Sequence, residues 1–221
     1  MATRRRRQAL CLGFALVLAC SGRAQAQKLR NHFDSDALMR VPAFFDFLVL
    51  GAPGEAQWKV MAEFNPPSTP HGVSQVLSER PAESIAVAIR RNADLQNGTI
   101  SLGIKRMSGR GGIVFRLASD KNYLALLLNP MSGDARLLAS REGRTSELAR
   151  GKAEGTRDWG VLTVVLSGSK VAASWEGKPL LEASDSAPAS GRTGIATAGP
   201  GIMSFDEFTI EPADKPAEKK P

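Results

Sequence analysis

The chain has 221 residues, 43% of them hydrophobic, and a formal net charge of +7. This length is sufficient for one domain with a sizeable core. Five of the 29 basic residues are arginines within residues 1–26, and without them 24 basic residues face 22 acidic ones, a net charge of +2. The rest of the chain therefore does not have the charge of a nucleic-acid-binding protein.

Residues 1–26 predict a signal peptide. Arginines precede an apolar run, Ala9 to Cys20, which is too short to span a bilayer, and Ala24-Gln25-Ala26 fits a cleavage site. Cleavage there would leave Gln27 first in an exported, periplasmic or extracellular protein. An alternative cut precedes Cys20, because Val17-Leu18-Ala19 resembles a lipobox, and a lipid on Cys20 would then anchor the protein to a membrane.

Both cysteines, Cys11 and Cys20, belong to this leader. A chain that begins at Gln27 has no disulfide and no thiolate metal ligand. Burial of apolar surface must therefore supply its stability.

Beyond the leader, short segments alternate apolar and polar residues, as half-buried strands do. Residues 28–56 show no clear period. The expected strands, in chain order, are 57–64, 85–90, 100–105, 114–117, 123–128, 162–166, 171–175 and 204–211. The segment 123–128 is almost entirely apolar, so we expect it to be buried on both faces.

Turn residues separate these segments at intervals of about 8–12 residues, which is the spacing of hairpins in a sandwich. Examples are Asn97-Gly98, Glu142-Gly143 and Glu176-Gly177. The pattern predicts an all-β, jelly-roll-like sandwich of two antiparallel sheets in a single domain over residues 27–211. Residues 212–221 are rich in proline and lysine and are predicted to be disordered.

Several motifs occur in a suggestive order: Gly111-Gly-Ile-Val-Phe-Arg116, Asp120-Lys-Asn-Tyr123 with Asn129, Glu176-Gly-Lys178 and Phe205-Asp-Glu-Phe208. Together they resemble a family of exported bacterial concanavalin A-like (laminin-G-like) jelly rolls described as 3-keto-disaccharide hydrolase-like or glycoside hydrolase-like. The resemblance covers about residues 30–211. It implies a concanavalin-like fold and a function on glycans.

Three segments depart from the pattern of that family. Leu127 stands where relatives tend to have arginine, Ala196–Ile202 replaces a run with tryptophan, lysine and an acid, and Gly109–Gly112 lacks an aspartate. At these positions, side chains that could bind or cleave a sugar are replaced by small or apolar ones. These losses favour a non-catalytic carbohydrate-binding module over an enzyme.

Four polar residues of the central hairpin are candidates for ligand binding: Arg116, Asn122, Tyr123 and Asn129. Arg116 and Asn122 could donate hydrogen bonds to sugar hydroxyls, and Tyr123 could stack on a sugar ring. The alternative is that Arg116 forms an ion pair with Asp120 across the turn and that Tyr123 belongs to the core.

The resemblance also implies a structural calcium ion where the first and last strands meet. Asp34 and Asp206 are placed to supply the hard oxygen ligands that calcium requires. The alternative is that both carboxylates cap strand ends.

The sequence predicts no catalytic residues. It lacks the Glu-x-Asp-x-x-Glu motif of laminarinase-like jelly rolls, adjacent Asp206 and Glu207 face opposite ways in a strand, and His32 and His71 have no metal-ligand spacing. Three function classes stay open: a binding module, a glycoside hydrolase-like enzyme acting on keto-disaccharides or glycans, and a structural or assembly protein without a small ligand. For the first we expect a groove with exposed aromatic residues and few acids. For the second we expect converging carboxylates or a histidine in a concave groove, and for the third a flat, filled face.

Overall fold

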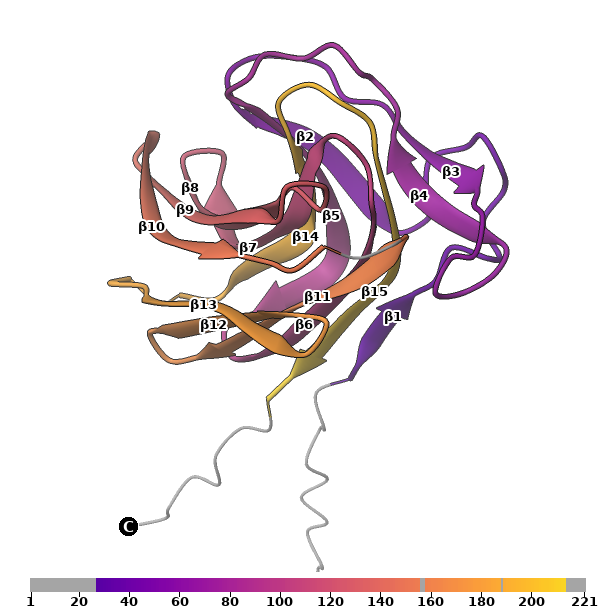
Figure 1. Ribbon diagram of the computed structural model, residues 1–221. Helices are drawn as coiled ribbons and strands as arrows, with labels where there is room; N and C mark the ends of the chain where they lie inside the picture. Colours follow the sequence, from indigo (N-terminus) through magenta and orange to yellow (C-terminus); the bar gives the residue numbers. More distant parts are fainter. Residues whose placement is uncertain (1–26, 156–157, 188, 214–221) are drawn as a thin grey trace, which may run out of the picture.

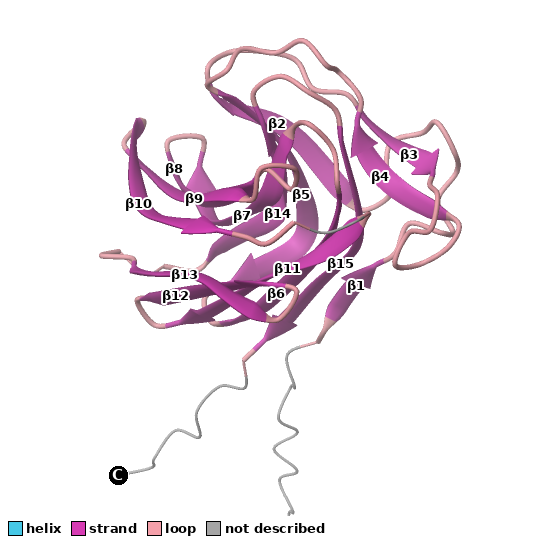
Figure 2. Ribbon diagram, in the orientation of Figure 1, coloured by secondary structure: helices cyan, strands magenta, loops and turns pink. Residues whose placement is uncertain are grey.

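The computed structural model describes residues 27–155, 158–187 and 189–213, and these ranges contain strands, turns and loops but no helix (Figure 2). The predicted signal peptide, with Cys20, and most of the predicted tail lie outside them. A helix able to cross a membrane is not found in the described ranges. The prediction of an all-β single domain is confirmed.

The strands form two antiparallel sheets that pack face to face (Figure 1). The eight-stranded sheet has the order β13 (Lys178–Ser184), β12 (Lys170–Trp175), β11 (Trp159–Ser167), β6 (Gly98–Lys105), β15 (Met203–Pro212), β4 (His71–Gln75) and β3 (Trp58–Ala62), with β1 (Leu29–Asn31) also beside β15. The seven-stranded sheet has the order β10 (Arg144–Lys152), β9 (Asp134–Arg141), β8 (Asn122–Leu128), β7 (Arg110–Ser119), β14 (Gly191–Ala198), β5 (Ser84–Leu95) and β2 (Phe45–Gly51).

The first and last strands lie side by side. Leu29 of β1 is opposite Ile210 of β15, so the two ends of the described chain meet at the bottom of Figure 1. The strands from β7 to β10 follow one another as hairpins, whereas β14 enters between β7 and β5 from far along the sequence. This combination of hairpins and crossovers is the jelly-roll topology.

Alternation along the strands divides the seven-stranded sheet into two apolar faces. On β8, Leu124, Leu126 and Leu128 point into the core between the sheets. Tyr123, Ala125 and Leu127 belong to a separate apolar cluster on the other face. The prediction that this strand is buried on both faces is confirmed, and the second cluster makes the floor of the site described below.

The seven-stranded sheet is strongly curved, and its outer face is concave (Figure 1). Gly112 helps β7 and β8 to approach each other, because a Cβ atom there would lie 1.9 Å from the carbonyl oxygen of Leu126. The concave face also has its own small apolar cluster, which includes Val87 and Val114, both 0% exposed.

The absence of a period in residues 28–56 does not mean an absence of strands, since β1 and β2 lie there. β2 is an edge strand with β5 on one side only. Its Phe47 is 37% exposed while Phe45 is buried, so the usual alternation of polar and apolar residues is blurred. Pattern reading finds such edge strands poorly.

Candidate functional site

A hollow of about 730 Å³ lies on the concave face of the seven-stranded sheet. We call it the concave hollow. Leu127 and Leu138 on neighbouring strands belong to its floor, together with Ile85 from β5. The segments 108–110 and 198–200 border it on another side. An apolar floor with a few polar groups at its margin is the usual form of a small-ligand site.

Two of the four predicted ligand-binding residues line this hollow, Tyr123 and Asn129. Tyr123 is the one aromatic residue among those that line the hollow, and it is only 1% exposed. The exposed aromatic residues expected of a binding groove are therefore not found there, and Tyr123 belongs to the floor. Asn129 holds its own turn, because its Oδ1 accepts hydrogen bonds from the backbone N–H groups of Met131 and Ser132, each at 3.0 Å. Its Nδ2 has no partner among the described residues and can donate to a ligand.

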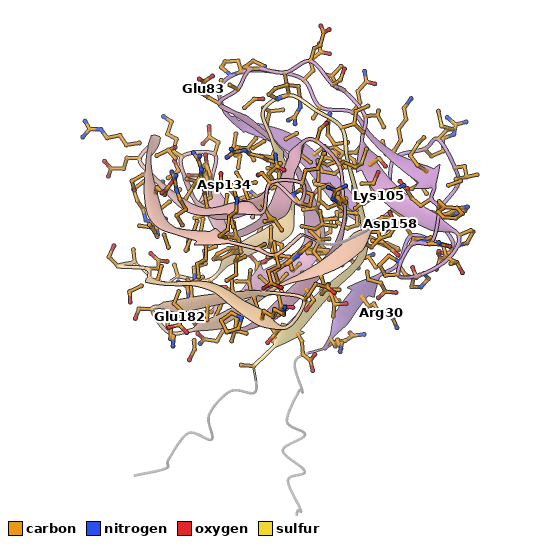
Figure 3. All side chains as sticks on the ribbon, in the orientation of Figure 1. Arg30, Glu83, Lys105, Asp134, Asp158 and Glu182 are labelled. Carbon is orange, nitrogen blue, oxygen red and sulfur yellow. The ribbon has the colours of Figure 1, made fainter. Side chains whose placement is uncertain are left out.

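Two arginines that the sequence analysis did not select, Arg110 of β7 and Arg136 of β9, also line the hollow. Their side chains are 36% and 35% exposed, and both approach the same oxygen of Asp134, at 3.2 Å and 3.1 Å. Figure 3 shows Asp134 over this part of the sheet. The one carboxylate side chain among the residues that line the hollow is Glu83, on the loop leading into β5 (Figure 3).

Arg116 does not face the concave side, although strand alternation predicts that it should. The β7–β14 and β7–β8 registers shift near it, and its φ of +50° places it in a bulge. A bulge adds one residue and re-aims the side chain. Arg116 therefore points into the end of the sandwich, where its Nη1 lies 2.7 Å from Asp185 and its Nη2 donates to the Gly168 carbonyl.

This ion pair is buried, with the Arg116 and Asp185 side chains 2% and 1% exposed. Arg116 pairs with Asp185 rather than with Asp120, the partner that proximity in sequence suggested. Burial raises the pKa of Asp185, but the Ala187 backbone N–H and the guanidinium groups of Arg116 and Arg141 outweigh it, so the pKa is lowered overall.

Asn122 holds two hairpins together rather than facing the hollow. Its Nδ2 donates to Ser119 Oγ at 3.2 Å, and its Oδ1 accepts a hydrogen bond from the backbone N–H of Glu142 at 3.1 Å. Of the four candidates, the structure thus brings Tyr123 and Asn129 together and gives Arg116 and Asn122 contacts within the fold.

The carboxylates of Asp34 and Asp206 are occupied by hydrogen-bond donors. Asp34 accepts from the His71 backbone N–H, and Asp206 accepts from the backbone N–H groups of Ser68 and Glu207 at 2.6 and 2.7 Å. A calcium ion requires oxygen ligands, and these donors would have to move aside. The described residues contain no group of three or more His, Cys, Asp or Glu that could hold a metal. As arranged, these residues do not fit a calcium site.

Asp206 is nevertheless unusual, since it is 0% exposed. Burial raises its pKa from 3.8 to about 6, against the opposing effect of the Ser68 and Glu207 hydrogen bonds. A carboxyl with such a pKa could serve as a general acid. It lies in the eight-stranded sheet under Ser68, however, and not in the concave hollow.

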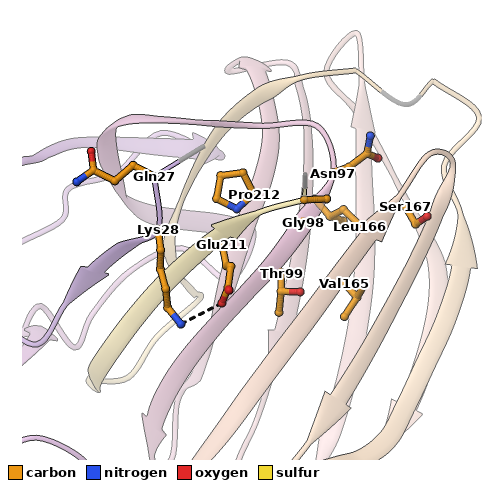
Figure 4. Close-up of a pocket in the computed structure, with 11 residues that line it drawn as sticks. Gln27, Lys28, Asn97, Gly98, Thr99, Val165, Leu166, Ser167, Glu211 and Pro212 are labelled. Carbon is orange, nitrogen blue, oxygen red and sulfur yellow. Dashed lines mark ion pairs between the residues drawn. The ribbon is translucent and has the colours of Figure 1, made fainter. Parts of the chain in front are cut away.

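A second hollow lies where β1, β6, β11 and β15 end, on the eight-stranded sheet (Figure 4). Its charged residues, Lys28 and Glu211, pair with each other at 3.0 Å, and both side chains are more than half exposed. Thr99, Val165 and Ser167 are among its uncharged lining residues. The concave hollow, by contrast, is floored by Ile85, Tyr123 and Leu127 of a separate buried apolar cluster, so it is the stronger candidate.

The positions at which the sequence differs from the family that it resembles lie together at the concave hollow. Leu127, Gly109 and Ala198 all line it. Those departures are thus the sequence signal that could have located the site. Arg136 lies directly opposite Leu127 on the next strand, but no motif marks it.

Comparison with solved structures places this architecture among known folds. No protein-family model matches the sequence, and no curated protein matches it. A β-glucanase from Bacillus licheniformis aligns with a TM-score of 0.54 at 7% identity, covering 84% of this chain and 98% of the enzyme. The chain has a concanavalin-like jelly-roll fold.

Two further structures agree with this assignment. A protein of unknown function with a galectin-like fold from Bacillus subtilis aligns with a TM-score of 0.53 at 13% identity, covering 75% of this chain and 89% of that one. The carbohydrate-binding module CBM66 from Bacillus subtilis aligns with a TM-score of 0.51 at 15% identity, covering 69% and 94%. At these identities the likeness concerns the fold.

Proposed function

We propose that this protein is an exported, non-catalytic carbohydrate-binding module of the cell envelope that takes its ligand in the concave hollow. The observation that carries the proposal is the hollow itself: about 730 Å³ over an apolar floor, with arginine and asparagine donors at its margin. Apolar side chains can pack on the C–H faces of a sugar ring, while donors of this kind bind its oxygens.

Structures with the same fold support a glycan as ligand. One is a carbohydrate-binding module and another is a β-glucanase. Function still has to be argued from the site, because one fold hosts many activities. Export rests on the leader, residues 1–26, and the mass of the mature N-terminus would distinguish a chain beginning at Gln27 from one beginning at a lipidated Cys20.

The carboxylates argue against the alternative of a glycoside hydrolase-like enzyme. Glycosidases require two of them on either side of the scissile bond, one with a raised pKa. Glu83 is the one carboxylate among the residues that line the hollow. Asp134 forms ion pairs with two arginines, and Asp206 lies in the other sheet. The hollow also argues against a structural protein, for which we expected a flat, filled face.

Glycan-array binding followed by calorimetry on the purified mature protein tests the proposal. Thr145 is exposed at the margin of the hollow, and we expect Thr145→Trp to fill it and weaken binding about tenfold or more, equivalent to at least about 1.4 kcal/mol. No reducing sugar should be released in any assay.

The matched control is Val165→Trp, which places the same side chain in the second hollow, where Val165 is 44% exposed. It should leave affinity unchanged. Loss of binding in Val165→Trp with normal binding in Thr145→Trp would move the site to the other sheet. Absence of binding to every glycan would refute the proposal.

A further inference from the structure

A chain of alternating charges runs along the concave face on the side of β7, β9 and β10. It consists of Arg110, Asp134, Arg136, Glu147 and Arg150, and we call it the arginine ladder. Arg136 Nε lies 3.1 Å from Asp134 and 3.8 Å from Glu147 Oε2, and Arg150 Nη2 lies 3.0 Å from the same Glu147 oxygen. Three cations face two carboxylates, so the ladder has a net charge of +1.

The ladder does not use all of its donors. Arg110 and Arg136 meet Asp134 through one nitrogen each, and both reach the same oxygen, Oδ2. The ion pairs of Arg136 use Nε, so its Nη1 and Nη2 groups have no partner among the described residues. A guanidinium with free terminal N–H groups can bind a planar carboxylate with two parallel hydrogen bonds.

The opposite side of the hollow has the opposite charge. Glu83 lies on the loop leading into β5, away from Asp134 in Figure 3. An anionic ligand group would be repelled there and attracted at β9. The hollow is thus asymmetric in charge, with an apolar floor between the cationic side at β9 and the anionic side at Glu83.

We propose that the concave hollow selects an acidic saccharide and that the terminal N–H groups of Arg136, assisted by Arg110, bind the carboxylate of a uronic acid unit. The inference rests on the proposed function and specifies its ligand. A neutral sugar presents both donors and acceptors, whereas the guanidinium groups of Arg110 and Arg136 and the Nδ2 of Asn129 can only donate. A carboxylate satisfies donors with acceptors alone.

The decisive probes are hexamers of galacturonate and glucuronate, each compared with its fully methyl-esterified form, which has the same backbone without the charge. We expect the wild-type protein to bind one of the acids about tenfold or more tightly than its ester, the difference that one charge-assisted hydrogen bond typically gives. This preference should weaken with added salt, because the arginines are partly exposed.

Arg136→Gln should abolish the preference for the acid over the ester. The matched control is Arg91→Gln, which removes the same charge from another exposed pair, with Asp46, outside the concave hollow. Arg91→Gln should retain the preference. Circular dichroism and the urea midpoint should be the same for both variants, so that a folding defect is not read as a binding defect.

The outcomes separate this inference from the proposed function. Equal binding of acid and ester, or binding of neutral glycans alone, would overturn the acidic ligand and leave the carbohydrate module standing. An unchanged preference in Arg136→Gln would overturn the assigned residue. Tighter binding of a sulfated oligosaccharide than of either uronate would overturn the carboxylate, and absence of binding to any saccharide would overturn both proposals.

Discussion

Asp185→Asn is expected to lower the free energy of unfolding by about 3–5 kcal/mol, the usual cost of leaving one partner of a buried ion pair without its counter-charge. Asp185 and Arg116 are both almost fully buried, and Arg116 lies 2.7 Å from the carboxylate. Asparagine keeps the size of the side chain but not its charge, so the Arg116 guanidinium stays buried with carbonyl partners only. Urea unfolding at neutral pH measures the loss.

Arg141→Gln is the control for this prediction. Arg141 also pairs with Asp185, but its side chain is 34% exposed, so water can replace the lost interaction. We expect a loss of about 1 kcal/mol or less. The double variant Arg116→Met with Asp185→Leu should recover much of the stability, because it removes both buried charges. A loss below about 1 kcal/mol for Asp185→Asn would contradict the importance that we give to this pair.

The protein should gain about 2–3 kcal/mol of stability from Asp206 alone when the pH falls from about 7 to about 4. In the folded protein the pKa of Asp206 is about 6, against 3.8 ordinarily. Between these values the folded state holds the proton and the unfolded state does not. Stability therefore falls as the pH rises through this interval, which is opposite to the effect of an ion-paired aspartate.

Asp206→Asn isolates this contribution, since asparagine does not titrate. The free energy of unfolding of the wild type, minus that of the variant, should rise from pH 7 to pH 4 and be flat above pH 7. Ser68→Ala removes a hydroxyl that donates to both carboxylate oxygens at 3.0 Å, which favours the charged form. In Ser68→Ala, the pH at which the stability contribution of Asp206 changes should therefore be higher than in the wild type. A flat difference between the wild type and Asp206→Asn would show that the carboxyl is not buried as described.

Asp185 acts in the opposite direction at lower pH. Because its pKa is lowered in the folded protein, the stability that it contributes is present above the ordinary pKa and is lost as the pH falls below it. For these two groups together, stability should be greatest near about pH 4. The maximum arises because Asp206 is buried without an ion pair, whereas Asp185 forms ion pairs with Arg116 and Arg141.

The sequence predicted most strands inside the two sheets, although not β4, β9 and β14, and at the sheet edges it predicted β3 but not β2, β10 or β13. β6, β11 and β12 were found because apolar residues alternate with more exposed ones along them, and β8 because it is a continuous apolar run buried on both faces. β2 was not, because an edge strand buries its side chains less regularly. β10 gave no periodic signal, since almost all of its residues are exposed.

The candidate site was predicted only in part, because its residues come from separate strands. Tyr123 and Asn129 were selected from one hairpin and do line the hollow. Arg136 has no motif around it and gains its position only from its register opposite Leu127. Arg116 was expected on the same face as Tyr123, and one bulge turned it inward.

The sequence by itself determined the all-β class, the hairpin spacing and the apolar strands, since alternation and turn residues act locally. Only the tertiary structure decided that Asp185, 69 positions away, pairs with Arg116 and that Asp206 is closed off by Ser68, 138 positions away. It also curved one sheet into a hollow between Arg136 and Glu83. Burial, pKa and charge complementarity depend on such distant neighbours, which no local pattern records.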